Sequence, residues 1–186
     1  MNRKLKLSEL NRSSVEEYKK AQKVPIIVVL DNIRSLSNVG SIFRTVDCFG
    51  LEAIYLCGIT AQPPHREITK TAIGATQSVD WSYFDTTMDA LDFLEQEGYI
   101  IVSVEQAKNT IKLTELDHLP KKRMAVIFGN EVEGVSQGVV DRSDHCIELE
   151  QFGTKHSLNV SVCAGIVINQ LSTIYRQKDQ NHSQPL

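Results

Sequence analysis

The chain has 186 residues, of which 41% are hydrophobic and 23% are charged, and its formal net charge is -3. These proportions are typical of a soluble globular protein with one domain, and no apolar run approaches the roughly 18 residues that a membrane-spanning helix requires. We therefore exclude a membrane protein. The basic start of the chain lacks the apolar stretch of an export signal, so we expect a cytoplasmic location.

The charge is unevenly distributed along the chain. Residues 1–25 contain seven basic and three acidic side chains, a local charge of +4, which leaves -7 for the rest. A basic arm on an acidic body is suited to contact with nucleic-acid phosphates, although a solvated N-terminal helix explains the same charges equally well. We expect a basic arm at 1–25, one domain at 26–176 and a polar, disordered tail at 177–186.

Short apolar runs rich in β-branched residues predict five strands. They span residues 26–30, 53–57, 99–104, 124–128 and 146–149. Because most of these runs are apolar on both faces, they fit parallel strands that are covered on both sides. The predicted class is α/β, with a mainly parallel sheet and helices on both faces.

Two helices are predicted between the strands from apolar residues at helical spacing. The first opens near Asn38, and Gly50 should end it. The second covers residues 87–97 and ends at Gly98, with Met88, Leu91 and Leu94 facing inward. The four cysteines and five histidines show no metal-binding spacing, so we expect reduced core cysteines and no metal site.

The first of three polar motifs, residues 38–44 (NVGSIFR), follows the first predicted strand. Ligands of open α/β sheets bind at the loops after strand carboxyl ends, so its position is favourable. Arg44 should share a helix face with the small residues Gly40 and Ser41, which leaves room for a ligand beside the guanidinium. Alternatively, Asn38 simply caps the helix and Arg44 pairs with Asp47.

The second motif, residues 128–134 (FGNEVEG), also follows a predicted strand. Its two glycines allow a tight turn and a close approach to a ligand around Glu131 and Glu133. Neither of the usual glycine-rich phosphate-loop patterns is present, which disfavours a nicotinamide enzyme or a P-loop NTPase. Alternatively, the motif is an ordinary turn, with Ser136 as the N-cap of the next helix.

The third motif, residues 153–161 (GTKHSLNVS), runs into an apolar segment. Ser157 is predicted to cap the last helix, with Leu158 and Asn159 in its first turn beside free backbone N–H groups. Residues 160–168 are apolar or small on nearly every side, so the helix should be buried, in part against a partner subunit. Alternatively, it is a capped core helix without a ligand.

Together, N-x-G-x-x-x-R, F-G-N-E-x-x-G and G-x-x-x-S-L-N-V-S resemble the three motifs of the SpoU/TrmH branch of the SPOUT methyltransferase superfamily. The resemblance spans residues 26–175 and includes the order and separation of the motifs. It implies a C-terminal deep trefoil knot, a homodimer, binding of S-adenosylmethionine, and methylation of a ribose 2′-hydroxyl in tRNA or rRNA. The compact chain with its basic arm slightly favours tRNA.

By matching positions, the resemblance implies that Arg44 is the catalytic residue that activates the hydroxyl, assisted by Asn38, Glu131, Ser157 and Asn159. Because a guanidinium keeps its proton in proteins, we expect Arg44 to bind the hydroxyl or phosphate while another group takes the proton. The resemblance places the cofactor against Leu56, Cys57, Gly58, Phe128, Gly129, Asn130, Leu149, Gln151, Gly153, Ser157 and Leu158.

One segment departs from the family pattern. Many relatives have proline and methionine where this chain has Glu150 and Gln151, close to the expected cofactor loop. The departure leaves open a noncatalytic RNA-binding protein that keeps the fold. A base-methylating enzyme is disfavoured by the first motif. Substrate choice would rest on the basic arm, the loop of residues 59–67 and the groove of the dimer.

Overall fold

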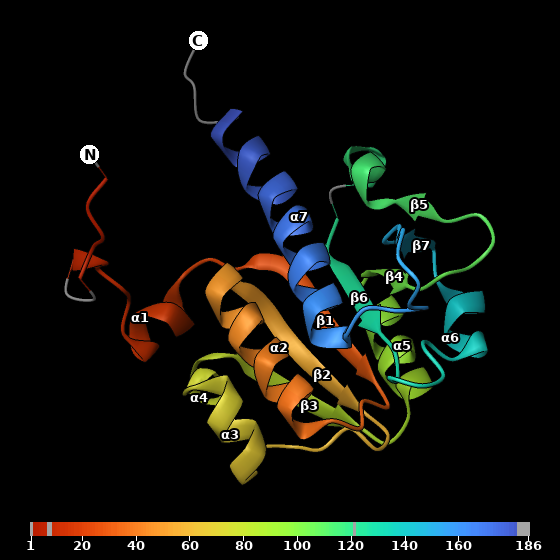
Figure 1. Cartoon of the computed structure of the whole chain (residues 1–186), viewed down its shortest axis with the longest axis horizontal. Helices are drawn as coiled ribbons and strands as arrows, with labels where there is room; N and C mark the ends of the chain where they lie inside the picture. The colour runs from red at the N-terminus through yellow and green to blue at the C-terminus, as the bar shows by residue number, and fades with distance from the viewer. Residues whose placement is uncertain (1, 7–8, 121, 182–186) are drawn as a thin grey trace.

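A computed structural model describes residues 2–6, 9–120 and 122–181 (Figure 1). Seven strands form one sheet in the order β3-β2-β1-β6-β4-β7-β5, and every pair of neighbours is parallel. The strands are β1 (Val24–Asp31), β2 (Leu51–Cys57), β3 (Asp80–Phe84), β4 (Ile100–Val104), β5 (Ile111–Lys112), β6 (Met124–Phe128) and β7 (His145–Glu148). The predicted α/β class with a parallel sheet is confirmed.

Helices cover both faces of the sheet (Figure 1). They are α1 (Val15–Lys20), α2 (Leu36–Phe49), α3 (Arg66–Ala72), α4 (Ala75–Ser78), α5 (Thr87–Gln96), α6 (Gln137–Arg142) and α7 (Val160–Asn181), with a 3-10 helix at Leu113–His118. One core cluster joins Val28 of β1 to α2 and α7, and a second joins Val29 to α5. Adjacent residues of a strand face opposite sides, so β1 contributes to both cores.

The helix predicted from residue 38 is α2. Gly50 ends it in the left-handed conformation at φ 61°, as expected. The predicted start is two residues late, because Ser35 is the N-cap and Asn38 is already helical and buried. The backbone carbonyl of Phe49 accepts a hydrogen bond of 2.8 Å from Arg176 of α7, so the two helices are joined at this end.

One inward-facing residue of α5 was predicted wrongly. Leu91 and Leu94 are buried, but Met88 is 37% exposed. The buried stripe contains Thr87 and Ala90 instead, at the three- and four-residue spacing of a helix face, and Met88 lies one residue off that stripe. The prediction of core cysteines also fails at Cys48, which is exposed on α2, whereas Cys57 is buried.

Two strands were missed, because β3 is polar and β5 has two residues. β3 is an edge strand that exposes Asp80, Ser82 and Tyr83, so it lacks a buried apolar run.

The last helix, α7, extends to Asn181, into the predicted tail, and residues 182–186 lie outside the described residues. No helix in the described part of the chain is both long and apolar enough to cross a membrane.

Candidate active site

The three motifs are joined by side-chain hydrogen bonds. The Asn38 amide donates to Glu131 Oε1 at 3.0 Å, and the Asn159 amide donates to Asn38 Oδ1 at 3.1 Å. One residue from each motif therefore belongs to a single chain of contacts, although the first motif is widely separated in sequence from the other two. We call Glu131, Asn38 and Asn159 the motif triad.

Glu131 holds the loop that leads into α2. Besides the Asn38 amide, its carboxylate accepts the backbone N–H groups of Arg34 at 2.9 Å and Ser35 at 3.0 Å. Burial alone would raise the pKa of Glu131, but these hydrogen bonds outweigh burial and lower it. Glu131 is therefore an ionised acceptor that fixes the start of α2 rather than a base waiting for a proton.

Asn159, and not Ser157, caps α7. The helix begins at Val160, and Asn159 Oδ1 accepts the backbone N–H of Ser161 at 2.9 Å and its hydroxyl at 2.7 Å. The predicted cap was two residues early, because serine and asparagine are equally good N-caps by type. Leu158 and Asn159 thus precede the helix instead of forming its first turn.

The second motif is a tight turn closed by its own backbone. Asn130 and Gly134 exchange two N–H···O bonds of 3.0 and 2.9 Å, and the Asn130 amide donates to the carbonyl of Asn32 at 2.7 Å. A Cβ on Gly129 would lie 2.1 Å from the carbonyl carbon of Gly134, so no larger residue fits there. Ser136 is the N-cap of α6, as considered above, although its side chain makes no capping hydrogen bond.

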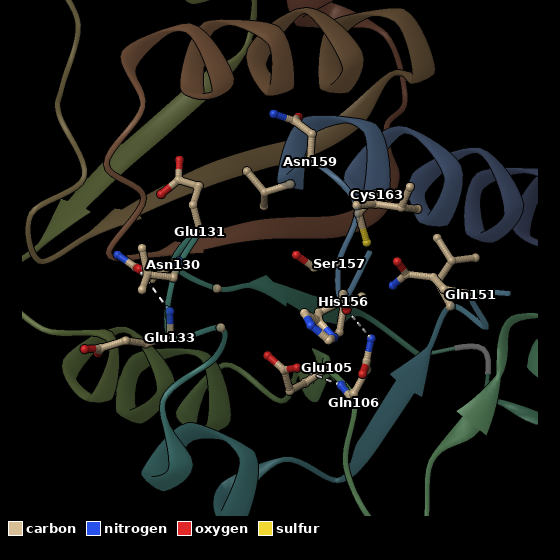
Figure 2. A pocket seen from close by; sticks show the side chains of 17 residues that line it. Glu105, Gln106, Asn130, Glu131, Glu133, Gln151, His156, Ser157, Asn159 and Cys163 are labelled. Atoms are coloured by element: carbon tan, nitrogen blue, oxygen red, sulfur yellow. Dashed lines mark hydrogen bonds between the residues drawn. The ribbon is translucent and has the colours of Figure 1, made fainter. Parts of the chain in front are cut away.

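A cavity of about 480 Å³ opens at the carboxyl ends of β4, β6 and β7 (Figure 2). Its lining comes from residues 104–106 at the end of β4, residues 129–134 after β6, and residues 149–163 between β7 and the first turn of α7. In the last of these segments the lining residues are Leu149, Gln151, His156, Ser157, Leu158, Asn159, Val160 and Cys163. The cavity has the size and position of a ligand site in an open α/β fold.

Eight of the predicted site residues line this cavity: Gly129, Asn130, Glu131, Leu149, Gln151, Ser157, Leu158 and Asn159. Phe128 is buried directly before it, and Gly153 is exposed outside the lining. Leu56, Cys57 and Gly58 lie apart from the lining, at the end of β2, which β1 separates from β6.

The lining residues that were missed include Val104, the last residue of β4, and Glu105 and Gln106, which follow it. A usable signal existed, since the run at 99–104 was predicted to be a strand and ligands gather at the carboxyl ends of parallel strands. The others are Val132, Glu133, Gly134, His156, Val160 and Cys163. All but Cys163 belong to the second or third motif, and Cys163 follows the third.

Arg44 is exposed on α2 and lies outside the cavity lining. In the described part of the chain it has no ion pair, and Asp47 accepts the Ser78 hydroxyl instead, so the alternative Arg44–Asp47 pair is not formed. The expected ligand space beside Gly40 is also absent. A Cβ on Gly40 would lie 2.1 Å from Thr71 Oγ1, because α3 packs directly against this face.

The wall formed by residues 149–159 is mostly exposed. Phe152 is 92% exposed. Two contacts connect this wall to neighbouring segments. The Gln106 amide, after β4, donates to the His156 carbonyl at 3.0 Å, and Glu150 pairs with Lys112 of the edge strand β5 at 2.8 Å. Among the residues that the structure describes, no group of three or more His, Cys, Asp or Glu side chains could hold a metal ion.

The sequence profile described as the SpoU rRNA Methylase family matches residues 25–169. The chain belongs to this family. It is 31% identical to the tRNA (guanosine(18)-2'-O)-methyltransferase of Aquifex aeolicus over 169 residues, which are 89% of this chain and 75% of that relative. It is 26% identical to a Staphylococcus haemolyticus protein named for the TrmH family of tRNA/rRNA methyltransferases, and it spans 64% of that protein's length.

Solved structures with the same fold agree with this assignment. The A. aeolicus TrmH/SpoU tRNA modifying enzyme superposes with a TM-score of 0.76 at 27% identity, covering 92% of this chain and 84% of that one. An AdoMet bound rRNA methyltransferase from Sinorhizobium meliloti gives a TM-score of 0.74 at 22% identity, with coverages of 88% and 59%. At that identity the second structure supports the fold alone.

Proposed function

We propose that this SpoU-family chain uses S-adenosylmethionine to methylate a ribose 2′-hydroxyl in RNA, with tRNA favoured over rRNA. The observation that carries the proposal is the motif triad, which brings the three motifs together at the rim of one cavity. The A. aeolicus relative and a Thermus thermophilus relative at 27% identity are both named tRNA (guanosine(18)-2'-O)-methyltransferases, which supports the ribose hydroxyl as the target.

The cavity residues fit S-adenosylmethionine. The volume of about 480 Å³ suits a ligand of this size. Leu149, Leu158 and Val160 offer apolar surface for the adenine ring, and the turn of residues 129–134 offers backbone polar groups to the rest of the ligand. When bound, S-adenosylmethionine supplies a methyl group activated by the adjacent sulfonium charge.

Arg44 would bind the RNA rather than the cofactor. Its guanidinium is exposed and, in the described residues, carries no ion pair, so its hydrogen-bond donors are available to a hydroxyl or phosphate. Glu131 fixes the start of α2 and thereby the place of Arg44 relative to the cavity. Correct placement of a reacting hydroxyl can supply a large part of a rate enhancement.

The proposal includes a homodimer and a C-terminal trefoil knot, as the family resemblance implies. Val162 and Ile166 on the first half of α7 are 51% and 38% exposed, and a second copy would cover them. Sedimentation of the purified chain checks the dimer, and a mass of 20.9 kDa in solution would contradict it.

The ribose assignment is tested by incubating the chain with methyl-labelled S-adenosylmethionine and total RNA, followed by alkaline hydrolysis. A methylated 2′-hydroxyl cannot attack its neighbouring phosphate, so labelled dinucleotides that resist alkali are expected. Label that appears solely in mononucleotides would rule out the ribose and indicate a base instead.

Replacing Arg44 with alanine should lower methyl transfer by about 100-fold or more, because a group that orients or polarises the hydroxyl is lost. Calorimetry should show unchanged binding of S-adenosylmethionine, since Arg44 lies outside the cavity lining. The matched control is Arg142→Ala on α6, whose partners Asp92 and Glu95 are exposed and contribute little stability. Full activity of Arg44→Ala would remove Arg44 from the mechanism.

The rival proposal, a noncatalytic RNA-binding protein, rests on the Glu150 and Gln151 departure. Glu150 is exposed, pairs with Lys112 and is not among the cavity-lining residues, whereas Gln151 lines the cavity. Gln151 is therefore the part of the departure that a bound cofactor would meet. A wild-type chain that gives no heat of binding with S-adenosylmethionine would favour the rival.

A further inference from the structure

The cavity has an acidic lining. Its charged side chains are Glu105, Glu131 and Glu133, and no lysine or arginine is present among the described residues that line it. The Glu131 carboxylate is already engaged by three donors on the α2 side. Glu133 is exposed, where water screens its charge. Glu105, the third carboxylate of the lining, lies directly after β4 (Figure 2).

The Glu105 carboxylate is held in a fixed place. Its Oε2 accepts the backbone N–H of Val135 at 2.8 Å, and its Oε1 accepts the backbone N–H of Gln106 at 2.7 Å. The second motif closes around it, since a Cβ on Gly134 would lie 2.1 Å from Oε2. Each oxygen uses one acceptor position in these bonds and keeps another for the cavity.

The negative charge of Glu105 affects the ionisation of Cys163, a lining residue on α7. Cys163 lines the cavity from α7, and burial together with the nearby negative charge of Glu105 raises the pKa of its thiol to about 11. A cation bound between the two walls would experience the same field with the opposite, favourable sign. The cavity is therefore better suited to a ligand that carries a positive charge than to its neutral counterpart.

Building on the proposed function, we propose that Glu105 makes the cavity select the sulfonium-bearing S-adenosylmethionine over its demethylated product, S-adenosylhomocysteine. Transfer of the methyl group to a hydroxyl forms a C–O bond, breaks the S–C bond, leaves a neutral thioether and releases one proton. The product thus carries one positive charge fewer than the substrate. The attraction to Glu105 is lost at that moment, so the product leaves more readily.

Calorimetric titration of the full chain with each ligand tests this selection through the ratio of their dissociation constants. In the wild type, S-adenosylmethionine should bind more tightly. Glu105→Gln should raise the dissociation constant of S-adenosylmethionine by about tenfold while changing that of S-adenosylhomocysteine by less than about threefold. Glu105→Asp keeps the charge and should keep most of the ratio. Glu16→Gln, an exposed carboxylate on α1, is the control and should change neither constant.

A merely structural role gives a different result. If Glu105 only braces the second motif, Glu105→Gln will weaken both ligands equally, and the unchanged ratio overturns the inference. A wild-type chain that binds both ligands equally overturns it too, whereas one that binds neither overturns the proposed function as well. If Glu105→Gln does not fold, the inference is tested on the wild type with an analogue of S-adenosylmethionine that carries an ammonium group in place of the sulfonium. The wild type should bind it more tightly than S-adenosylhomocysteine, and weaker or equal binding would count against selection by charge.

Discussion

The two walls of the cavity differ in how they are held. The wall of residues 129–134 is closed by its own backbone bonds and tied by Asn130 and Glu131 to the loop after β1. In the opposite wall, residues 152–159 are all exposed, and its contacts to neighbouring segments include those with Gln106 after β4 and Lys112 of β5. One wall is therefore a preformed surface, while the other has few contacts to lose when it adjusts to a ligand.

The two walls meet at Asn159. Its side-chain amide donates a hydrogen bond to Asn38, which in turn donates to Glu131, and its side-chain oxygen Oδ1 caps α7. The fixed wall thus determines where α7 begins and where α2 presents Arg44. Residues 152–158 of the exposed wall can change position while Asn159 keeps its contacts to both helices.

A glycine substitution in each wall should give the largest difference. Gly129→Ala places a Cβ 2.1 Å from backbone atoms of Gly134 and Val135, which cannot move without opening the turn. We expect it to lower the free energy of unfolding by about 3 kcal/mol. For Gly153→Ala in the exposed wall, the new Cβ meets no atom within 4 Å, so the free energy of unfolding should change by less than about 0.5 kcal/mol.

Chemical denaturation at neutral pH measures both variants. Equal stability of the two proteins would mean that the turn of residues 129–134 is no more constrained than the exposed wall. The contrast between the walls would then be wrong.

Glutamate substitutions within the second motif should give a smaller effect that depends on pH. Glu131→Gln replaces one of the oxygens that accept three donors, and we expect it to lower the free energy of unfolding by about 1 kcal/mol at pH 7, because the residue is exposed and water weakens these bonds. Glu133→Gln, two residues along, is the control. Its side chain is exposed like that of Glu131 but accepts no hydrogen bond among the described residues, so the substitution should lower the free energy of unfolding by less than about 0.5 kcal/mol.

The pH dependence follows from the direction of the shift. Burial opposes ionisation of Glu131, but its hydrogen bonds prevail and lower its pKa below the usual 4.5. The stabilisation by this carboxylate is therefore complete above pH 4.5 and is lost as the pH falls through the lowered pKa. The difference between wild type and Glu131→Gln should shrink in that acidic range, and a constant difference would show that the charge is not what holds the wall.

The fold was predictable where burial leaves a pattern. β1 and β6 are apolar on both faces because the sheet buries both, and Gly50 marks a helix end that needs a left-handed residue. The edge strand β3 carries no such pattern because none of its five residues is buried. The convergence of the three motifs was predicted from their order and resemblance, and the hydrogen bonds of the motif triad agree with it.

The details of the site needed three dimensions. Ser157 and Asn159 are both suitable caps by type, and the contact between Asn159 and Asn38 selects the second. The resemblance assigned Leu56 to Gly58 to the cofactor, and the separation of their strand from β6 by β1 is visible only in the sheet order. Glu105 is a single acidic residue after a strand, and one such residue forms no pattern. Its role emerges from the second motif, which folds around its carboxylate.

The smallest expected effect concerns the exposed wall. Gln106→Ala removes the hydrogen bond to the His156 carbonyl, next to the exposed Lys155. An exposed hydrogen bond of this kind contributes about 0.5 kcal/mol, so trypsin should cut after Lys155 about two to three times faster while global stability stays unchanged. Gln62→Ala, a substitution at another exposed glutamine, is the control and should leave the rate as it is.

The fragment that begins at His156, followed by mass spectrometry over time, reports the cut directly. If the proposed function holds, S-adenosylmethionine should slow the cut in wild type and variant alike, because a ligand between the walls adds contacts to the exposed one. An unchanged rate in Gln106→Ala without ligand would show that the His156 contact does not restrain this wall. In that case its order would depend on the motif triad through Asn159, and the two walls would be less independent than their contacts indicate.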